Sequence, residues 1–150
     1  FLKDQNKMII YDYPIILKGE KKIIQKKTSN FLNTYWGYIH PTSCISIRKT
    51  FINEVFKTTL NNEFPNIWLD LRILLFSKYK NNYDIIFDNL TYYRQSDENV
   101  SSKFKKYSRS WWIRRNEAHD YYFDFIKKNN LKFKKNFDYY VTKIINKLIK

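Results

Sequence analysis

Short runs of apolar and β-branched residues dominate the first third of the chain and predict β-strands. Two such runs within residues 7–27 flank a glycine, so we expect a tight turn at residues 18–20. Pro14 lies inside the first run and, because it has no amide donor, keeps that run from being an ordinary central strand throughout. A third run predicts a strand near residues 44–47, after a loop at residues 35–42.

The segment TFINEVFKT, residues 50–58, has the spacing of a short helix. Thr50 is a candidate N-cap, because its hydroxyl can accept a hydrogen bond from an amide of the first turn. Phe51, Val55 and Phe56 are the candidates for its inward face. The chain is thus expected to change from strands to a helix at about residue 50.

The segment PNIWLDLRILLFSKYK, residues 65–80, predicts a longer helix with Pro65 at or near its first turn, where proline is tolerated. Its apolar stripe consists of Ile67, Leu71, Leu74 and Leu75. At about 100° per residue, Asp70 lies roughly 60° from Ile67, at the margin of this stripe, whereas Arg72 lies about 140° away on the other side. Asp70 is therefore placed where a carboxylate can be partly buried.

The last third of the chain predicts two further helices. The first has apolar positions at helical spacing at Trp111, Ala118, Tyr122 and Phe125. The second gathers its apolar residues on one face: Phe137, Val141, Ile144, Ile145, Leu148 and Ile149. The predicted order of elements, with strands first, alternating helices and strands next and helices last, indicates an α/β or α+β domain with a helical tail.

A chain of 150 residues with 43% hydrophobic content is long enough for one domain with a core. Its single cysteine, Cys44, excludes an intramolecular disulfide and argues against a cysteine-based zinc site, which favours a reducing compartment. The two histidines, His40 and His119, give no support to a His-rich metal site. Without a leader or a run of about 18 apolar residues, we expect a cytoplasmic protein. Because the first residue is Phe1, we also expect a fragment whose beginning is missing.

The net charge of +14 is concentrated near the C-terminal end. Residues 1–100 hold 14 Lys and Arg against 10 Asp and Glu, whereas residues 101–150 hold 14 against 4. This excess is typical of a basic nucleic-acid-binding module, and the pairs Trp111-Trp112 and Arg114-Arg115 could stack on bases or lie at a membrane surface. Alternatively, an AT-rich coding bias explains part of the lysine content, Trp111 belongs to a core face, and the two arginines are solvated.

Asp70 is the strongest candidate for chemistry in the sequence. Partial burial beside an apolar stripe can raise the pKa of a carboxyl group, which would let Asp70 act as a general base toward an alcohol. The alternative is that an acidic residue here complements the positive end of the helix dipole, which is common. Spacing alone does not separate these two roles.

A second group of candidates lies at the end of the run DIIFDNLTYYRQ, which has a strand-like composition: Tyr93, Arg94 and Gln95 could bind a phosphate-bearing ligand. Alternatively, Arg94 is an edge-strand arginine whose stem covers tyrosines. Thr42 and Ser43 could line a polar pocket or be small residues of a strand. The glycosylation patterns NLT and NVS are short and arise by chance in an Asn-rich chain, so we discount both.

Four segments, taken in order, resemble the second half of bacterial family 2 glycosyltransferases: YIHPTSCISIRK, IWLDLRILLFSKY, NLTYYRQSDENVSS and WWIRRNEAHDYY. The resemblance covers roughly residues 7–125 and implies an α/β fold of the GT-A type. Residues 1–108 would be the acceptor side of the glycosyltransferase domain, and residues 109–150 a basic amphipathic helical tail. Two positions depart from the usual pattern: Leu69 stands where an acidic residue precedes the base, and Gln95-Ser96 where a His follows Tyr-Arg.

The same resemblance implies transfer of a sugar from a nucleotide-sugar donor to an acceptor hydroxyl, by inversion, in polysaccharide or glycoconjugate synthesis. Asp70 would be the catalytic base. The substrate would be bound by Thr42, Ser43, Trp68, Tyr93, Arg94 and Gln95. A divalent metal, Mg²⁺ or Mn²⁺, would be held by the nucleotide-binding half, which is expected to be missing here, so that the fragment alone is inactive. The basic C-terminal helices would rest against anionic lipid at the inner face of the membrane, which suits a saccharide or lipid-linked acceptor.

Overall fold

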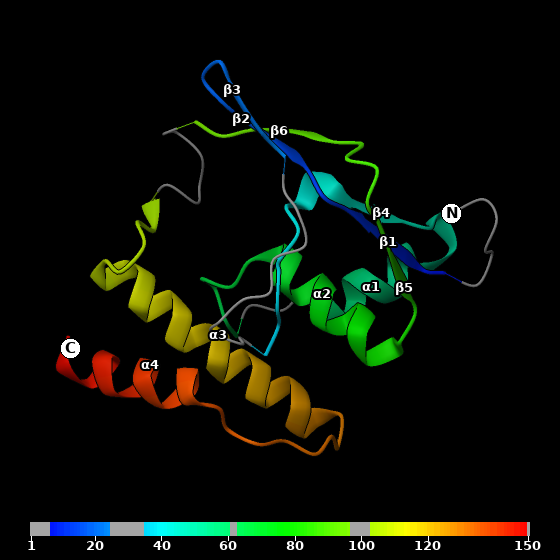
Figure 1. The fold of residues 1–150 in the computed structure, drawn as a ribbon. Helices are drawn as coiled ribbons and strands as arrows, with labels where there is room; N and C mark the ends of the chain where they lie inside the picture. The colour runs from blue at the N-terminus through cyan, green and yellow to red at the C-terminus, as the bar shows by residue number, and fades with distance from the viewer. Residues whose placement is uncertain (1–6, 25–34, 61–62, 97–102, 150) are drawn as a thin grey trace. The chain divides into compact units, whose positions relative to one another are not determined.

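The structure, a computed structural model, describes residues 7–24, 35–60, 63–96 and 103–149 (Figure 1). It divides into two compact units. The sheet unit contains the described residues 7–24, 35–60 and 68–96, and the helical unit contains residues 63–67 and 103–149. Small mixed sheets and four α-helices in the described residues confirm the α/β class. Within these residues, no helix combines the length and the apolar character needed to cross a membrane.

The first sheet of the sheet unit has the strand order β4-β1-β5. Strand β1, Ile9–Asp12, pairs antiparallel with β4, Ile45–Ile47, and parallel with β5, Tyr83–Ile86. All four residues of β1 are buried, as is typical of a strand with neighbours on both sides. Strand β4 confirms the prediction of a strand near residues 44–47.

The second sheet has the order β3-β2-β6, with β2, Ile15–Lys18, antiparallel to β3, Lys21–Ile24, and parallel to β6, Tyr92–Arg94. Gly19 in the β2–β3 turn has a φ of +58°, a left-handed conformation that glycine adopts without strain, and this confirms the predicted turn. Pro14 lies between β1 and β2. The first apolar run is therefore divided at its proline between the central strands of two sheets.

Two helices belong to the sheet unit: α1, Ile52–Thr59, and α2, Leu69–Lys80. Helix α1 follows a 3-10 turn, and its N-cap is Phe51 without a side-chain hydrogen bond, so the predicted Thr50 cap is wrong. Helix α2 begins at Leu69 rather than near Pro65, because Trp68 has extended backbone angles of −61° and 141°. The sequence predicts both helices, but it does not predict the residue at which either helix begins.

Helix α2 is buried along most of its length and not only on one stripe. From Leu71 to Ser77 every residue is buried, including Arg72 at 5% exposure. The Nη1 group of Arg72 donates a 3.0 Å hydrogen bond to the main-chain oxygen of Thr59, at the end of α1. This charge-assisted bond allows an arginine placed away from the apolar stripe to lie inside the unit.

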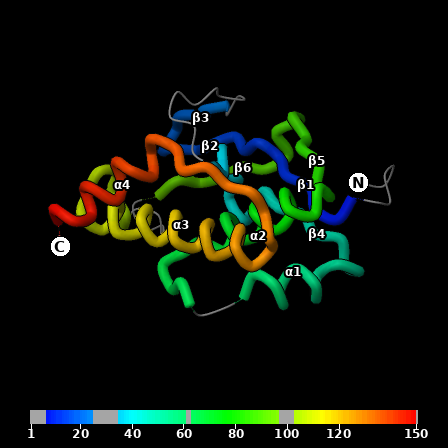
Figure 2. Tube along the Cα trace, turned by 90° about the horizontal axis from the view of Figure 1, so that it is seen from below, coloured from blue at the N-terminus to red at the C-terminus, as the bar shows by residue number. Residues whose placement is uncertain are grey.

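The helical unit is built on α3, Arg109–Lys128, and α4, Phe137–Leu148, which lie side by side as an antiparallel pair (Figures 1 and 2). The side chains of Ser108 and Asn136 cap their N-termini, each accepting a hydrogen bond from a first-turn amide. The structure thus confirms both helices that the sequence predicted near the C-terminal end.

Arg114 of α3 corrects one expectation about this helix. It is only 6% exposed, and its Nε donates a 2.9 Å hydrogen bond to the main-chain oxygen of Asn66. Its guanidinium carbon also lies 4.1 Å from the centre of the Phe104 ring, a cation–π distance. The predicted solvated position is therefore wrong for Arg114, because a carbonyl and an aromatic ring replace its water.

Candidate functional site

A pocket of about 180 Å³ lies in the sheet unit, at the edge of the first sheet where β1 and β5 end. Asp12 and Ile86 are partners in the parallel register, so these strands deliver side chains to the same edge. The turn before β4 and the segment between β5 and β6 complete the pocket. Its lining consists of Ile10, Asp12, Ser43, Cys44, Ser46, Ile86, Leu90 and Thr91.

Asp12 is the acidic residue of this pocket. It is 5% exposed, and within the described part of the chain its Oδ2 atom makes no hydrogen bond. A buried acceptor without a donor costs about 1–3 kcal/mol, and more when it is charged. The Cys44 thiol interacts with the Asp12 carboxyl group, and a donor for its Oδ2 atom could come from bound water or from a ligand.

Three hydroxyl groups line the same pocket, from Ser43, Ser46 and Thr91. Each hydroxyl can both donate and accept a hydrogen bond, and both serines are exposed. Together with apolar side chains such as Leu90, this lining suits a neutral ligand rich in hydroxyls. The volume is below the roughly 300–1,000 Å³ of pockets that enclose a drug-sized ligand, so it fits one part of a substrate.

Cys44 is the buried thiol of the pocket, 3% exposed. Burial, together with the negative charge of Asp12, raises the pKa of the thiol to about 11. Because a thiolate is the reactive form of cysteine, Cys44 is a poor nucleophile at neutral pH. This agrees with its expected place as a small residue without thiolate chemistry.

His40 fixes the end of β1 to the loop that precedes the pocket. Its Nδ1 lies 2.7 Å from the main-chain oxygen of Asp12, and its ring centre lies 5.0, 4.8 and 4.8 Å from those of Tyr11, Tyr13 and Tyr38. Burial lowers the pKa of His40 against the opposing effect of this hydrogen bond. A neutral imidazole with its proton on Nδ1 therefore donates to the carbonyl and orients Asp12.

Asp70 reaches the same edge of the first sheet but not the same pocket. It is half-buried in the first turn of α2, after the half-buried N-cap residue Trp68. Because β5 follows α2 after a short turn, the start of α2 lies at the edge where β1 ends. However, Tyr11 contacts α2 through Ser77, at 2.8 Å between the hydroxyl oxygens, and points to the face opposite Asp12. Asp70 and Asp12 therefore belong to opposite faces of one sheet edge.

The remaining predicted substrate-binding residues are also divided. Ser43 lines the pocket, whereas its exposed neighbour Thr42 is not part of the lining. Tyr93 and Arg94 lie in β6 of the second sheet. Gln95 follows that strand, and its main-chain amide donates a 2.8 Å hydrogen bond to the main-chain oxygen of Leu17 in β2. The structure therefore brings one of these residues to the pocket and leaves the others outside its lining.

Sequence patterns missed Asp12, His40 and Thr91. A signal for Asp12 exists in the sequence YDYP, where an acidic residue ends an apolar run just before a proline. No pattern in the sequence assigns His40 or Thr91 to a binding site. Their roles depend on which strands are neighbours, which the sequence does not state.

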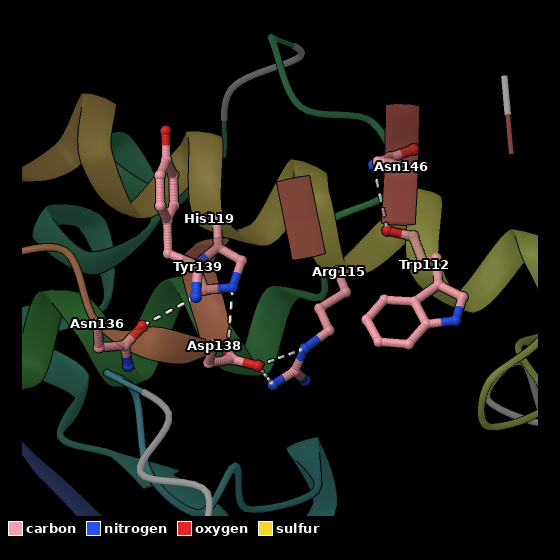
Figure 3. A network of polar contacts seen from close by, with 7 residues as sticks. All are labelled: Trp112, Arg115, His119, Asn136, Asp138, Tyr139 and Asn146. Atoms are coloured by element: carbon pink, nitrogen blue, oxygen red, sulfur yellow. Dashed lines mark hydrogen bonds and ion pairs between the residues drawn. The ribbon is translucent and has the colours of Figure 1, made fainter. Parts of the chain in front are cut away.

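In the helical unit, a cluster of charged and polar residues joins α3 and α4 (Figure 3). Asp138 Oδ1 accepts hydrogen bonds from Arg115 Nη2 at 2.5 Å and Nε at 3.1 Å, and Asp138 Oδ2 lies 3.0 Å from His119 Nε2. Burial alone would raise the pKa of Asp138, but His119 and Arg115 outweigh it and lower the pKa. His119 is 0% exposed and lies between the two helices, whereas Arg115 and Asp138 also line a pocket of about 230 Å³ in the helical unit.

The comparisons add no relative to these observations. A scan against protein-family models found no match, and neither did a search of curated proteins or a search of solved structures. Among residues 7–24, 35–60, 63–96 and 103–149, no group of three or more His, Cys, Asp or Glu side chains is placed to hold a metal ion.

Proposed function

We propose that the sheet unit forms the acceptor-binding part of a nucleotide-sugar-dependent glycosyltransferase. One observation carries this proposal: two of the segments that resemble family 2 enzymes, YIHPTSCISIRK and NLTYYRQSDENVSS, meet at one pocket and contribute Ser43 and Thr91 to it. The same pocket contains Asp12, whose Oδ2 has no hydrogen-bond donor within the described residues. A hydroxyl-rich acceptor would supply that donor.

A sugar ring is compatible with both the polar groups and the apolar side chains of the pocket lining. Its hydroxyls would donate to Asp12 and exchange hydrogen bonds with Ser43, Ser46 and Thr91. Its C–H face would pack on apolar side chains such as Leu90. Because a hydrogen bond to a charged group contributes about 1.5–3 kcal/mol, Asp12 would contribute most to the choice of acceptor.

In the transfer itself, the acceptor oxygen would bond to the anomeric carbon of the donor while the bond from that carbon to the nucleoside diphosphate breaks, with inversion. We assign Asp70 as the base that takes the acceptor proton and Asp12 as the residue that positions the acceptor. Ligands of open α/β sheets bind at the edge where the strands end, and both carboxylates lie there. The reacting hydroxyl would extend from the pocket around this edge toward the start of α2.

The donor would lie beyond the acceptor pocket. Arg94, exposed on β6 beside Tyr93 and Gln95, is the proposed contact for its phosphates. A bound divalent metal would neutralise the departing diphosphate. The described residues offer no group that could hold it, so the proposal assigns it to another part of the enzyme.

Binding of simple sugars to this chain tests the acceptor pocket. Saturation-transfer NMR with a panel of methyl pyranosides should detect a ligand whose affinity falls about tenfold or more in the Asp12→Asn variant, since a charged hydrogen bond is lost. Asp84→Asn is the matched control, because Asp84 is an exposed acidic residue of β5 outside the pocket. Equal affinities of both variants would remove Asp12 from the site.

Turnover tests the assignment of Asp70 separately. In the protein that carries this chain, nucleoside diphosphate release from a panel of nucleotide-sugars should depend on an added acceptor. The Asp70→Asn variant should lose this release while it keeps sugar binding, whereas Asp84→Asn should keep both. Unchanged turnover in Asp70→Asn would overturn the base assignment.

A further inference from the structure

Helix α4 packs against α3 with its polar face and turns its apolar face outward. The buried residues of α4 are Asp138, Thr142 and Asn146. Phe137, Ile144 and Leu148 are 74%, 59% and 79% exposed. At about 100° per residue, Phe137, Val141, Ile144 and Leu148 form one stripe, here called the outer face of α4, centred about 130° from the buried residues.

Polar contacts with α3 explain this orientation. Asp138 pairs with Arg115 and His119, and Asn146 Nδ2 donates a 3.4 Å hydrogen bond to the Trp112 main-chain oxygen (Figure 3). These contacts hold Asp138 and Asn146 against α3, while the buried Thr142 Oγ1 between them makes no hydrogen bond with the described residues. The outer face is consequently left to solvent.

Aromatic residues continue the outer face at the start of α3. A pocket of about 230 Å³ is lined by Tyr107, Trp111 and Trp112 together with Phe137 and Val141 of the outer face. Lys106 and the ion-paired side chains of Arg115 and Asp138 complete its lining. Tyr107 is itself 62% exposed. Indole and phenol rings combine an apolar body with a polar tip, which suits the boundary between water and lipid.

Cationic side chains accompany this apolar surface. Lys106 lines the aromatic pocket, and Lys147 lies exposed on α4 next to Leu148. Neither lysine takes part in an ion pair with the described residues, whereas Lys143 pairs with Asp120. Lys106 and Lys147 are therefore available to an anionic partner.

We propose that the outer face of α4, with the aromatic pocket beside it, docks on an anionic lipid bilayer. The apolar stripe would enter the headgroup boundary, the aromatic rings would lie at its edge, and the lysines would contact lipid phosphates. This proposal goes beyond sugar transfer and does not depend on it. It concerns the attachment of the helical unit to a membrane surface.

Charge favours a bilayer over two other occupants. A second copy would bring together two segments with 14 basic and 4 acidic residues each, which repel one another. An oligonucleotide would be bound by cations and by stacking on aromatic rings, to which Ile144 and Leu148 contribute nothing. An anionic bilayer complements both the charge and the apolar stripe.

Vesicle flotation of the chain tests the proposal. The chain should float with vesicles that contain phosphatidylcholine and phosphatidylglycerol, and not with phosphatidylcholine alone. The double variant Ile144→Asp, Leu148→Asp should bind at least about tenfold more weakly, because two apolar side chains are withheld from the bilayer. Lys147→Gln should bind about fivefold more weakly, which corresponds to the loss of one basic residue near the surface.

Matched controls separate docking from unfolding. Ile24 of β3 is 58% exposed, close to the 59% of Ile144, so Ile24→Asp makes the same chemical change elsewhere and should float like the parent chain. Lys57→Gln on α1 is the corresponding control for charge. Urea denaturation of each variant should match the parent, because the altered side chains are exposed.

Three results would overturn the proposal. The first is equal flotation with neutral and anionic vesicles, or flotation that the double variant does not reduce. The second is concentration-dependent self-association in analytical ultracentrifugation that the double variant abolishes, which would assign the face to a second copy. The third is tight binding of a fluorescent oligonucleotide without vesicle binding, which would assign the basic charge to nucleic acid.

Discussion

Replacing Asp138 by Asn tests how the helical unit is held together. The change preserves the size of the side chain but removes the negative charge that pairs with Arg115 and contacts His119. Asp138 is 8% exposed, and the Arg115 side chain is 15% exposed. The guanidinium left without its carboxylate would therefore remain largely out of water.

The structure sets the size of the expected effect. Removing one partner of a fully buried ion pair costs about 3–5 kcal/mol. Arg115 keeps some contact with water, and its guanidinium carbon lies 4.9 Å from the centre of the Trp111 ring, so part of this cost is relieved. We expect the free energy of unfolding of the helical unit to fall by about 2–4 kcal/mol.

Asp120→Asn is the matched control, because it alters another Asp that links the same two helices. Lys143 Nζ lies 2.5 Å from Asp120 Oδ1, yet the side chains are 29% and 45% exposed. An ion pair in contact with water contributes less than about 1 kcal/mol. Asp138→Asn and Asp120→Asn therefore make the same chemical change, one at a buried carboxylate and the other at an exposed one.

Urea denaturation followed by circular dichroism, together with hydrogen exchange of the α4 amides by mass spectrometry, measures both variants. In Asp138→Asn, exchange of α4 should accelerate by about 30-fold or more, which corresponds to at least 2 kcal/mol. In Asp120→Asn it should change by less than about fivefold. Equal losses in the two variants would refute the conclusion that the buried cluster holds α4 against α3.

Three further predictions concern pH, a buried hydroxyl and the thiol. Burial alone would raise the pKa of Asp138, but its two partners lower it below 3.8. The ionised Asp138 therefore stabilises the fold above about pH 4, and this stabilisation is lost as the pH falls through the folded-state pKa. Urea midpoints measured against pH should show this loss in the parent and not in Asp138→Asn. Tyr11→Phe removes the bond to Ser77 and should cost about 1 kcal/mol in the free energy of unfolding of the sheet unit. Cys44, with its pKa raised to about 11 by burial, should resist a disulfide reagent at mildly alkaline pH until denaturant exposes it, and rapid labelling of the folded chain would contradict its placement.

Elements set by local chemistry could be predicted from the sequence. Gly19 permits the left-handed backbone of the β2–β3 turn, and Pro14 interrupts the first apolar run. The periodicity of the last two helices also appears in the structure. In each case the deciding property belongs to a few neighbouring residues.

Features set by distant neighbours could not be predicted in the same way. The run at residues 84–95 looks like one strand, but it enters the first sheet as β5 and the second as β6. Arg72 and Arg114 are buried because main-chain oxygens of Thr59 and Asn66 accept their hydrogen bonds. No local pattern reveals these acceptors.

The candidate site shows the same division. Ser43 was proposed from its segment and lines the pocket. Asp12 was not proposed, because its importance depends on burial without a donor, which only the packing of three strands creates. Asp70 is half-buried, as its position beside the apolar stripe predicts, while its role in catalysis stays a prediction.

Helix α4 shows why an amphipathic pattern does not tell which face is buried. Periodicity fixes the apolar stripe, but the direction of packing depends on what α3 offers, and α3 offers Arg115 and His119. Burying an aromatic or aliphatic side chain contributes about 1.5–3 kcal/mol, so leaving Phe137 and Leu148 in water forgoes a large stabilisation. A bilayer at the outer face of α4 would recover it. The buried Arg115–Asp138 ion pair and the exposed apolar stripe are therefore consequences of one packing arrangement, and disrupting Asp138 should weaken lipid binding as well as the helix pair.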